Sequence, residues 1–313
     1  MISYISKRLL LAIPTLLAVL TLVFIIVRVL PGDPAQASLG DYASAEAVEA
    51  LRVKLGLDKP LPVQYVDFLS GIVRGDLGKS MKNSQPVTER ILFVLPYTIE
   101  LTLASVLVGI ILGVPLGIIT ALRRNGIADY LGRIFSLAGL SVPAFYLGIF
   151  FMLIFGVELG WLPVVGAGDR SNWASRISHL VLPACTLGLI MTAYVTRMTR
   201  SAMLNIMGED YIRTARSKGL ADRVVMFRHA LRSALIPIVS IVGLFTVSLI
   251  GSSVMTEIVF SRPGLGKMMV DSMKQRDYTT IQSIMVVYAF LIVMINLLVD
   301  ILYGFVDPRV RYE

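Results

Sequence analysis

The sequence has few charged residues, one cysteine and two histidines, and each shortage excludes a class of protein. Asp, Glu, Lys and Arg make up 16% of its 313 residues, against about 25% in soluble globular proteins. So few charges cannot coat a water-soluble fold of this size, and an apolar fraction of 56% excludes intrinsic disorder. The lone Cys185 excludes a disulfide framework, and His179 and His229 lie too far apart in the sequence to indicate a metal site. The composition predicts a membrane protein that holds no metal.

Motifs of enzymes and nucleotide-binding proteins are missing from the sequence as well. Gly78-Lys79-Ser80 ends like a P-loop, but the glycine that this motif needs five positions earlier is Val73. No HExxH or GxSxG motif and no carboxylate pair occurs in the apolar stretches, and Glu100, Glu257 and Asp300 fall toward their ends. We therefore expect a chain that is not an enzyme, holds no cofactor and lacks the carboxylates near the membrane midplane that a proton-driven carrier uses.

Six apolar stretches are long enough to cross a bilayer as helices, which takes about 20 residues each. Lys7-Arg8 before the first stretch imitates a secretory signal, but the uncharged run Leu9–Val27 is longer than the apolar region of a signal peptide, which has about 7–15 residues. We expect this segment to be retained. The result is an all-α integral membrane protein with six transmembrane helices. They are Leu9–Leu30, Tyr97–Leu122, Leu131–Val157, Leu180–Ala202, Ala234–Met255 and Ile281–Val306.

The distribution of Lys and Arg predicts the orientation. If the N-terminus lies inside, the inner segments carry 15 basic and seven acidic residues, while the outer segments carry 14 basic and 13 acidic ones. Basic residues gather on cytoplasmic loops, so both termini are predicted to be cytoplasmic. The net charge of +8 then follows from membrane topology and does not indicate nucleic-acid binding.

The longest connection, residues 31–96, predicts a small helical lobe outside the membrane. Pro31-Gly32-Asp33-Pro34 is expected to end the first helix. Ser44 is placed to cap a short helix that ends at Gly56. A second amphipathic helix is indicated by the spacing of Tyr65, Phe68, Leu69 and Ile72. The predicted division is the N-terminus and first helix (1–30), the outer lobe (31–96), a five-helix core (97–306) with an inner loop (203–233), and a tail (307–313).

Glycines at four-residue spacing mark the second apolar stretch. Gly109, Gly113 and Gly117 would allow another membrane helix to approach closely, either in the same chain or in another subunit. Trp161 and Trp173 fall in the predicted outer loop between the third and fourth stretches, where interfacial aromatics are expected.

The inner loop between the fourth and fifth stretches carries the strongest functional pattern. Asp210 is predicted to cap a helix Tyr211–Ser217, and Gly219 to end it in the left-handed conformation. Leu220 follows as an exposed apolar residue. Asp222 is predicted to cap a second helix, which carries Val224, Phe227 and Leu231 on one face. Such a basic hairpin suits docking into a groove of a soluble partner. The plainer alternative is an ordinary basic loop.

Gly208–Leu220 resembles the EAA motif of the permease subunits of binding-protein-dependent ABC importers for dipeptides, oligopeptides, glutathione and nickel. Arg213, Thr214, Ala215 and Gly219 fall on the EAA and glycine positions, although the first two depart from the general pattern and its closing proline is missing at Arg232. The resemblance covers nearly the whole chain and fits the first of the two permease types. Further matching segments are Pro31–Pro34, Leu55–Pro60, Gly75–Ser80, Pro263–Gly266, Gln275–Tyr278, Asn296–Asp300 and Asp307–Arg309.

This resemblance implies a type I importer fold in the bacterial inner membrane, with alternating access driven by partners. The expected partners are a second homologous permease, two cytoplasmic ATPases that hold ATP and magnesium, a periplasmic or lipid-anchored binding protein, and membrane lipid. Residues expected to couple to the ATPases are Asp210, Tyr211, Arg213, Thr214, Ala215, Arg216, Lys218, Gly219 and Leu220. Residues expected to contact the binding protein are Pro263, Gly264, Leu265 and Gly266.

The expected substrates are dipeptides, oligopeptides or glutathione, and Val157–Pro163 resembles the glutathione branch most. A nickel chelate stays open as an alternative within the same family, and an autonomous secondary carrier as an alternative of another class. The sequence predicts no residues for the substrate path.

Overall fold

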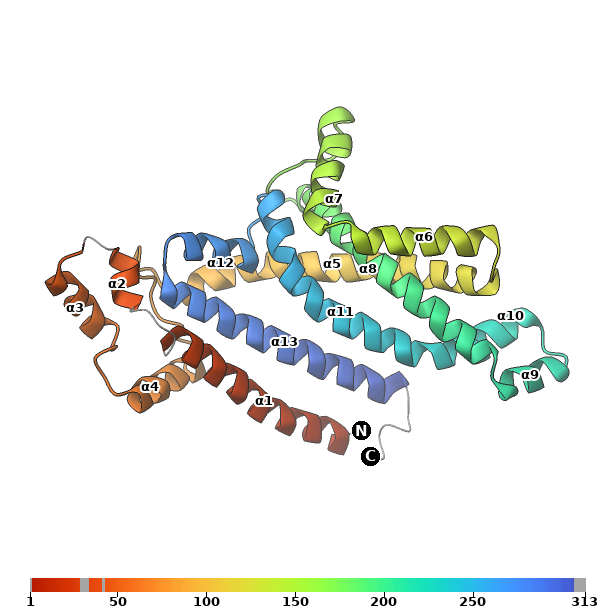
Figure 1. Cartoon of the computed structure of the whole chain (residues 1–313), viewed down its shortest axis with the longest axis horizontal. Helices are drawn as coiled ribbons and strands as arrows, with labels where there is room; N and C mark the ends of the chain where they lie inside the picture. The colour runs from red at the N-terminus through yellow and green to blue at the C-terminus, as the bar shows by residue number, and fades with distance from the viewer. Residues whose placement is uncertain (1, 29–33, 41–42, 307–313) are drawn as a thin grey trace. The chain divides into compact units, whose positions relative to one another are not determined.

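The computed structural model describes residues 2–28, 34–40 and 43–306, and the regular structure in these ranges is helical (Figure 1). The helices are α1 (Ile2–Arg28), α2 (Pro34–Leu39), α3 (Ala45–Lys54), α4 (Leu61–Val73), α5 (Val87–Leu122), α6 (Ile127–Ser141), α7 (Ala144–Phe151), η1 (Met152–Glu158), α8 (Trp173–Met207), α9 (Asp210–Ser217), α10 (Asp222–Val224), η2 (Val225–Ala230), α11 (Leu231–Val259), α12 (Leu265–Lys274) and α13 (Tyr278–Val306). The segments η1 and η2 are π-helical.

Five continuous helices in the described ranges are long and apolar enough to cross a membrane. They are Ile5–Arg28 of α1, α5, α8, the continuous run Asp222–Val259, and Tyr278–Leu302 of α13. The predicted third span, Leu131–Val157, is wrong as a single helix, because its two parts meet at an angle of 103°. Pro143 has no N–H for the helix ladder, and the preceding Val142 is extended, with φ −87° and ψ 123°. Six crossings result only if this bent pair counts as one.

The chain forms two compact units. The first unit comprises Met1–Ser6, Tyr97–Pro263 and Ile295–Glu313, and the second comprises Lys7–Pro96 and Gly264–Met294. Three sequence expectations fall at least partly outside the described residues: the end of the first predicted span, most of the Pro31–Pro34 break, and the tail 307–313.

Within the first unit, α5 lies directly against α8 along the three glycines of the second span. A Cβ atom on Gly109, Gly113 or Gly117 would lie 2.4, 2.7 or 2.5 Å from atoms of Met191, Val195 or Thr199, respectively. These distances are too short for carbon atoms, so only glycine permits this approach. The neighbour that the sequence left open is a helix of the same chain.

The second unit confirms the helices expected in the outer lobe. The Ser44 side chain accepts a hydrogen bond from Ala47 N at the start of α3, and Gly56 follows that helix with φ +66°. The aromatic stripe of α4 packs on α1: the Phe24 ring lies 5.2 Å from Tyr65 and 5.7 Å from Phe68, centroid to centroid. The predicted stripe of α4 therefore forms a packing surface.

Asp277 joins two of the matching segments within the second unit. Its carboxylate accepts hydrogen bonds from Ser80 Oγ (2.5 Å), Met81 N (3.0 Å) and Thr280 Oγ1 (2.7 Å). Burial alone would raise the pKa of Asp277, but these hydrogen bonds outweigh it and hold the pKa below its ordinary value. Gly78-Lys79-Ser80 is thus part of a structural anchor, with Ser80 buried beside the N-terminus of α13.

Candidate functional site

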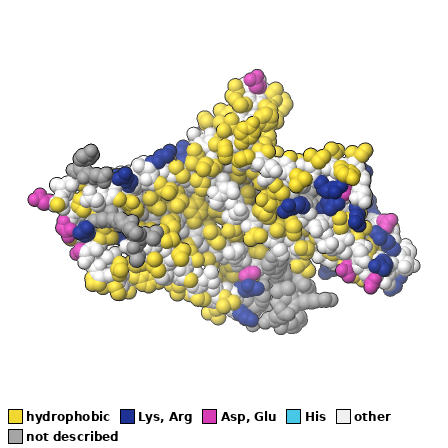
Figure 2. Space-filling view, viewed as in Figure 1, with side chains coloured by type: hydrophobic (Ala, Val, Ile, Leu, Met, Phe, Trp, Pro, Cys, Tyr) yellow, Lys and Arg dark blue, Asp and Glu magenta, His cyan; other side chains and the backbone are white. Residues whose placement is uncertain are grey.

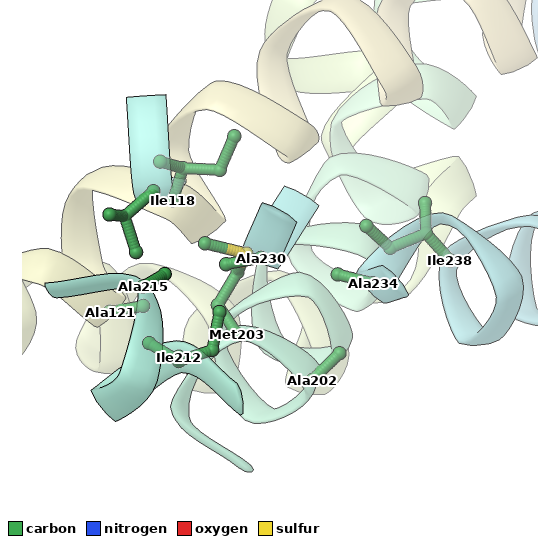
Figure 3. Close-up of a cluster of buried hydrophobic side chains, with 10 residues drawn as sticks. Ile118, Ala121, Ala202, Met203, Ile212, Ala215, Ala230, Ala234 and Ile238 are labelled. Carbon is green, nitrogen blue, oxygen red and sulfur yellow. The ribbon is translucent and has the colours of Figure 1, made fainter. Parts of the chain in front are cut away.

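Helix α9 is held by one apolar face. Ile212 is fully buried and Ala215 is 7% exposed, and both lie in a cluster built from α5, α8, α9, η2 and α11 (Figure 3). The other buried members of this cluster are Ile118, Ala121, Ala202, Met203, Val225, Ala230, Ala234 and Ile238. Packing against several helices at once makes α9 a firm part of the first unit.

The opposite face of α9 is polar and exposed. The Arg213 side chain is 72% exposed and that of Asp210 94%, and the two lie 3.5 Å apart as a surface ion pair. Arg216 Nε lies 3.3 Å from Asp222 Oδ1, and Tyr211 Oη bonds Ser233 Oγ at 3.1 Å. Figure 2 shows Lys and Arg side chains mixed with Asp and Glu at the end formed by α9 and α10, whereas hydrophobic side chains cover α7.

The end of α9 matches its prediction in detail. Gly219 has φ +76°, its N–H bonds the carbonyl of Arg216, and Leu220 N bonds the carbonyl of Ala215. This pair of bonds is a Schellman motif, which needs the left-handed conformation that glycine adopts at little cost. Leu220 is 40% exposed, as expected.

The predicted caps and the second amphipathic face are wrong. Glu209 occupies the N-cap position of α9 and Ala221 that of α10, without side-chain capping bonds, so Asp210 and Asp222 lie in the first turns. Val224 and Phe227 are exposed by 39% and 49%, whereas Val225, Ala230 and Ala234 are buried, and Leu231 is only partly buried. The wider turns of η2 shift the buried face away from the register of an α-helix.

One member of the expected coupling set differs from the rest in its surroundings. Ala215 is buried and anchors α9, so it offers a partner no surface, while Ile212 is an anchor that was not predicted. The other eight residues, Asp210, Tyr211, Arg213, Thr214, Arg216, Lys218, Gly219 and Leu220, are exposed.

A buried ion pair fixes α6 to α8. Arg200 donates from Nε and Nη2 to the two carboxylate oxygens of Asp129, at 2.6 and 2.8 Å. Asp129 is fully buried and also accepts a hydrogen bond from Asn125 N at 2.9 Å. The pair is bidentate, and bidentate Arg–carboxylate pairs are among the strongest hydrogen-bonded ion pairs in proteins.

A second buried charge cluster joins α5, α8 and the end of α11. Glu100 pairs with Arg176 and with Arg262, whose Nη2 lies 3.1 Å from the Glu100 carboxylate. Arg262 is 1% exposed, and Glu257, fully buried, accepts a hydrogen bond from Thr98 Oγ1 at 2.7 Å. Because α5 begins at Val87, Glu100 lies well inside this helix and not near its start as expected.

Sequence reasoning missed Arg176, Arg200 and Arg262, since it counted them only as loop charges. The partner of each arginine is 71 to 162 positions away, so sequence spacing could not identify the pairs.

A small cavity of about 110 Å³ lies between α8 and α11. The sequence predicted no residues of a substrate path, so none of the cavity's lining residues was expected. Tyr194 and Phe245 stack beside it with ring centroids 3.6 Å apart, and Ser248 and Ser252 contribute hydroxyl groups. Small-molecule sites usually measure about 300–1,000 Å³. The cavity is too small to hold a peptide.

The segment Pro263–Gly266 offers little surface for a binding protein. Gly264, Leu265 and Gly266 are buried, and Pro263 alone is partly exposed. In the described part of the chain no three His, Cys, Asp or Glu residues lie together in a way that could hold a metal ion.

Comparison with known proteins matches the whole chain to one kind of transport system. Residues 113–312 match the family described as binding-protein-dependent transport system inner membrane component, and residues 1–102 match the N-terminal family of the same membrane components. Over its full length and theirs, the chain is 46% identical to the glutathione transport system permease protein GsiC of Pectobacterium atrosepticum. It is 39% identical to the di/tripeptide transport system permease protein DppB of Pseudomonas aeruginosa, again over both full lengths.

A solved structure of the MetNI methionine ABC transporter in an inward-facing conformation supports the fold. Its chain matches with a TM-score of 0.58 at 21% identity, covering 72% of this chain and 99% of that one. The permease fold of type I ABC importers is thereby shown. This chain belongs to the family of inner membrane components of binding-protein-dependent transport systems, as a multi-pass permease subunit and not as an enzyme.

Proposed function

We propose that this permease subunit serves an ATP-driven importer of glutathione or other small peptides. The relatives named for glutathione and for di- and tripeptides are 39–46% identical over the full chain, which supports this substrate class. Peptide movement into the cytoplasm proceeds by alternating access, in a path that this chain shares with a second homologous permease. The small size of the cavity between α8 and α11 agrees with a path that needs both subunits.

The single observation that carries the mechanism is the two-faced character of α9. One face is buried among α5, α8, η2 and α11, and the other exposes basic side chains. A cytoplasmic ATPase bound to the exposed face would move α9, and the helices packed against its buried face would move with it. ATP and magnesium are bound by two such ATPases, and Asp210, Tyr211, Arg213, Thr214, Arg216, Lys218, Gly219 and Leu220 form the contact, with Ala215 beneath it.

The proposed orientation places both termini and α9 in the cytoplasm. The lobe of residues 31–96 then lies outside, together with Trp161 and Trp173, which are 68% and 71% exposed. A periplasmic or lipid-anchored binding protein would dock on this side. Because Gly264, Leu265 and Gly266 are buried, Pro263 is the only one of the four expected contact residues with some exposed surface.

The decisive experiment measures ATP hydrolysis by the assembled complex in proteoliposomes. Binding protein loaded with glutathione, dipeptides, longer peptides or a nickel chelate is added separately, and uptake of each compound is recorded. We expect glutathione or a short peptide to stimulate hydrolysis and to accumulate only with ATP. Uphill uptake by vesicles that lack the ATPases would contradict the proposal. If only the nickel chelate stimulates hydrolysis, the substrate is a nickel chelate and not a peptide.

A further inference from the structure

The second unit contains a pocket that has no part in the coupling site. It has a volume of about 480 Å³ and is formed by the end of α1, by α3 and α4, by the segment 76–78 and by the start of α13. Its polar lining includes Arg28, Lys54, Lys59, Gln64 and Gln282. The volume falls within the range of about 300–1,000 Å³ that small-molecule sites occupy.

Three buried polar atoms that line this pocket have no hydrogen-bond partner among the described residues. They are Arg28 Nε, Gln64 Oε1 and Gln282 Nε2, and the Gln282 side chain belongs to a residue that is 7% exposed. The amide nitrogen of Gln64 is engaged by the carbonyls of Lys59 and Leu57, which fixes the Gln64 oxygen as the free acceptor. A buried polar group without a hydrogen-bond partner destabilises the fold unless a ligand supplies that partner. Two donors and one acceptor are thus held ready for a ligand.

The charges of the pocket favour an anion. Asp67 already accepts a hydrogen bond from Lys59 Nζ at 2.8 Å, and Asp76 accepts one from Gly78 N at 2.9 Å. No acidic side chain in the described ranges pairs with Arg28 or Lys54. Three cations against two engaged carboxylates leave one positive charge in excess, which suits a singly charged anion. A zwitterionic peptide would find no free carboxylate for its amino group.

The pocket lies where two apolar spans end, and this position indicates the source of the anion. Arg28 is the last residue of the apolar span Ile5–Arg28, and Gln282 lies one turn after the start of the span Tyr278–Leu302. The apolar wall of the pocket includes Phe68, Ile72 and Val286, which belong to or pack on the cluster around Leu20 of α1. The ends of membrane spans lie at the level of lipid headgroups.

We propose that this pocket binds the headgroup of an anionic phospholipid with a hydroxylated headgroup, of the phosphatidylglycerol kind. Arg28 Nε and Gln282 Nε2 donate to the phosphodiester oxygens, and Gln64 Oε1 accepts from a headgroup hydroxyl. The apolar wall covers the glycerol and the first part of an acyl chain. The bound lipid fastens the lobe of α3 and α4 to the two spans that end there.

The test uses the full chain, purified with its accompanying subunits and stripped of lipid by detergent. Phosphatidylglycerol retained after addition is counted by native mass spectrometry, and its effect on the melting temperature is recorded. Phosphatidylethanolamine, soluble glycerophosphoglycerol, inorganic phosphate and glutathione are tested in parallel. We expect phosphatidylglycerol to bind and to raise the melting temperature, glycerophosphoglycerol to compete weakly, and glutathione to do neither.

The variants Arg28→Met and Gln282→Met should each weaken phosphatidylglycerol binding about tenfold or more, since a hydrogen bond to a charged group is lost. Arg28→Lys should keep part of the binding and shows that the unit still folds. The matched controls are Arg52→Met, which alters a half-buried residue paired with Glu49, and Gln275→Met, which alters an exposed residue. Both residues lie outside the pocket, and both variants should bind as the wild type does. Equal binding by all five variants would overturn the proposal, as would protection by phosphate alone or by glutathione alone.

Discussion

The charges on α9 and the charges buried between helices of the first unit follow opposite rules. On α9, Arg213 and Asp210 face each other at 3.5 Å with side chains that are 72% and 94% exposed. Between α6 and α8, Arg200 donates two hydrogen bonds to the fully buried Asp129. Exposed pairs contribute between zero and about 1 kcal/mol, whereas breaking a buried pair costs several. The first set is therefore available to a partner, and the second holds the helices together.

The largest effect on stability is expected when one buried carboxylate is removed. Asp129→Ala leaves Arg200 without its partner and should lower the free energy of unfolding by about 3 kcal/mol. Thermal unfolding of the purified chain measures the change. Asp210→Ala removes a carboxylate from the surface and should stay within about 0.5 kcal/mol of the wild type. Similar losses in both variants would abolish the distinction, and adding Arg200→Met to Asp129→Ala should recover part of the stability.

An effect of intermediate size is expected when a methyl group is added at a close contact between helices, compared with the same addition where there is open space. In Gly113→Ala the new Cβ would lie 2.7 Å from Val195 Cβ, so α5 and α8 must move apart. Overpacking of this kind costs about 1–3 kcal/mol. Gly251→Ala on α11 meets no atom within 4 Å and should be neutral or stabilising, because alanine favours a helix. The two melting temperatures should move in opposite directions, and a parallel shift would contradict the close approach.

Sequence reasoning predicted several local features correctly, although not the caps of α9 and α10, and it predicted long-range features poorly. The Ser44 cap, the left-handed Gly219 and the stripe from Tyr65 to Ile72 each depend on a few neighbouring residues, and all three are present. The π-helical turns of η2 and the bend at Pro143 changed the register or the direction of elements whose apolar pattern looked continuous. Arg262 and its partner Glu100 are 162 positions apart, and only the packing of α5 against its neighbours brings them together.

A smaller effect on stability, with a larger one on function, is expected at the end of α9. Gly219→Val forces a β-branched residue into φ +76°, at a cost of about 1–2 kcal/mol. The strain is local, so membrane insertion should persist while transport per ATP hydrolysed falls about fivefold or more. Gly219→Asn is the matched control, because asparagine tolerates this conformation, and it should keep most of the transport. Wild-type transport by the valine variant would show that the turn is not needed for coupling.

The smallest effect on stability belongs to the exposed cations of α9. Arg213→Ala should change the free energy of unfolding by less than about 0.5 kcal/mol, because its side chain is mostly in solvent. The same variant should weaken binding of the partner ATPase several-fold, and the difference from the wild type should shrink as salt is raised and the charges are screened. Co-purification at rising salt measures this. Arg74→Ala removes an exposed charge from the second unit and should leave ATPase binding unchanged. If both variants retain the ATPase alike, the basic face of α9 is an ordinary solvated surface, and the contact with the ATPase must be sought at the exposed apolar side chains Leu220 and Phe227, the latter in η2.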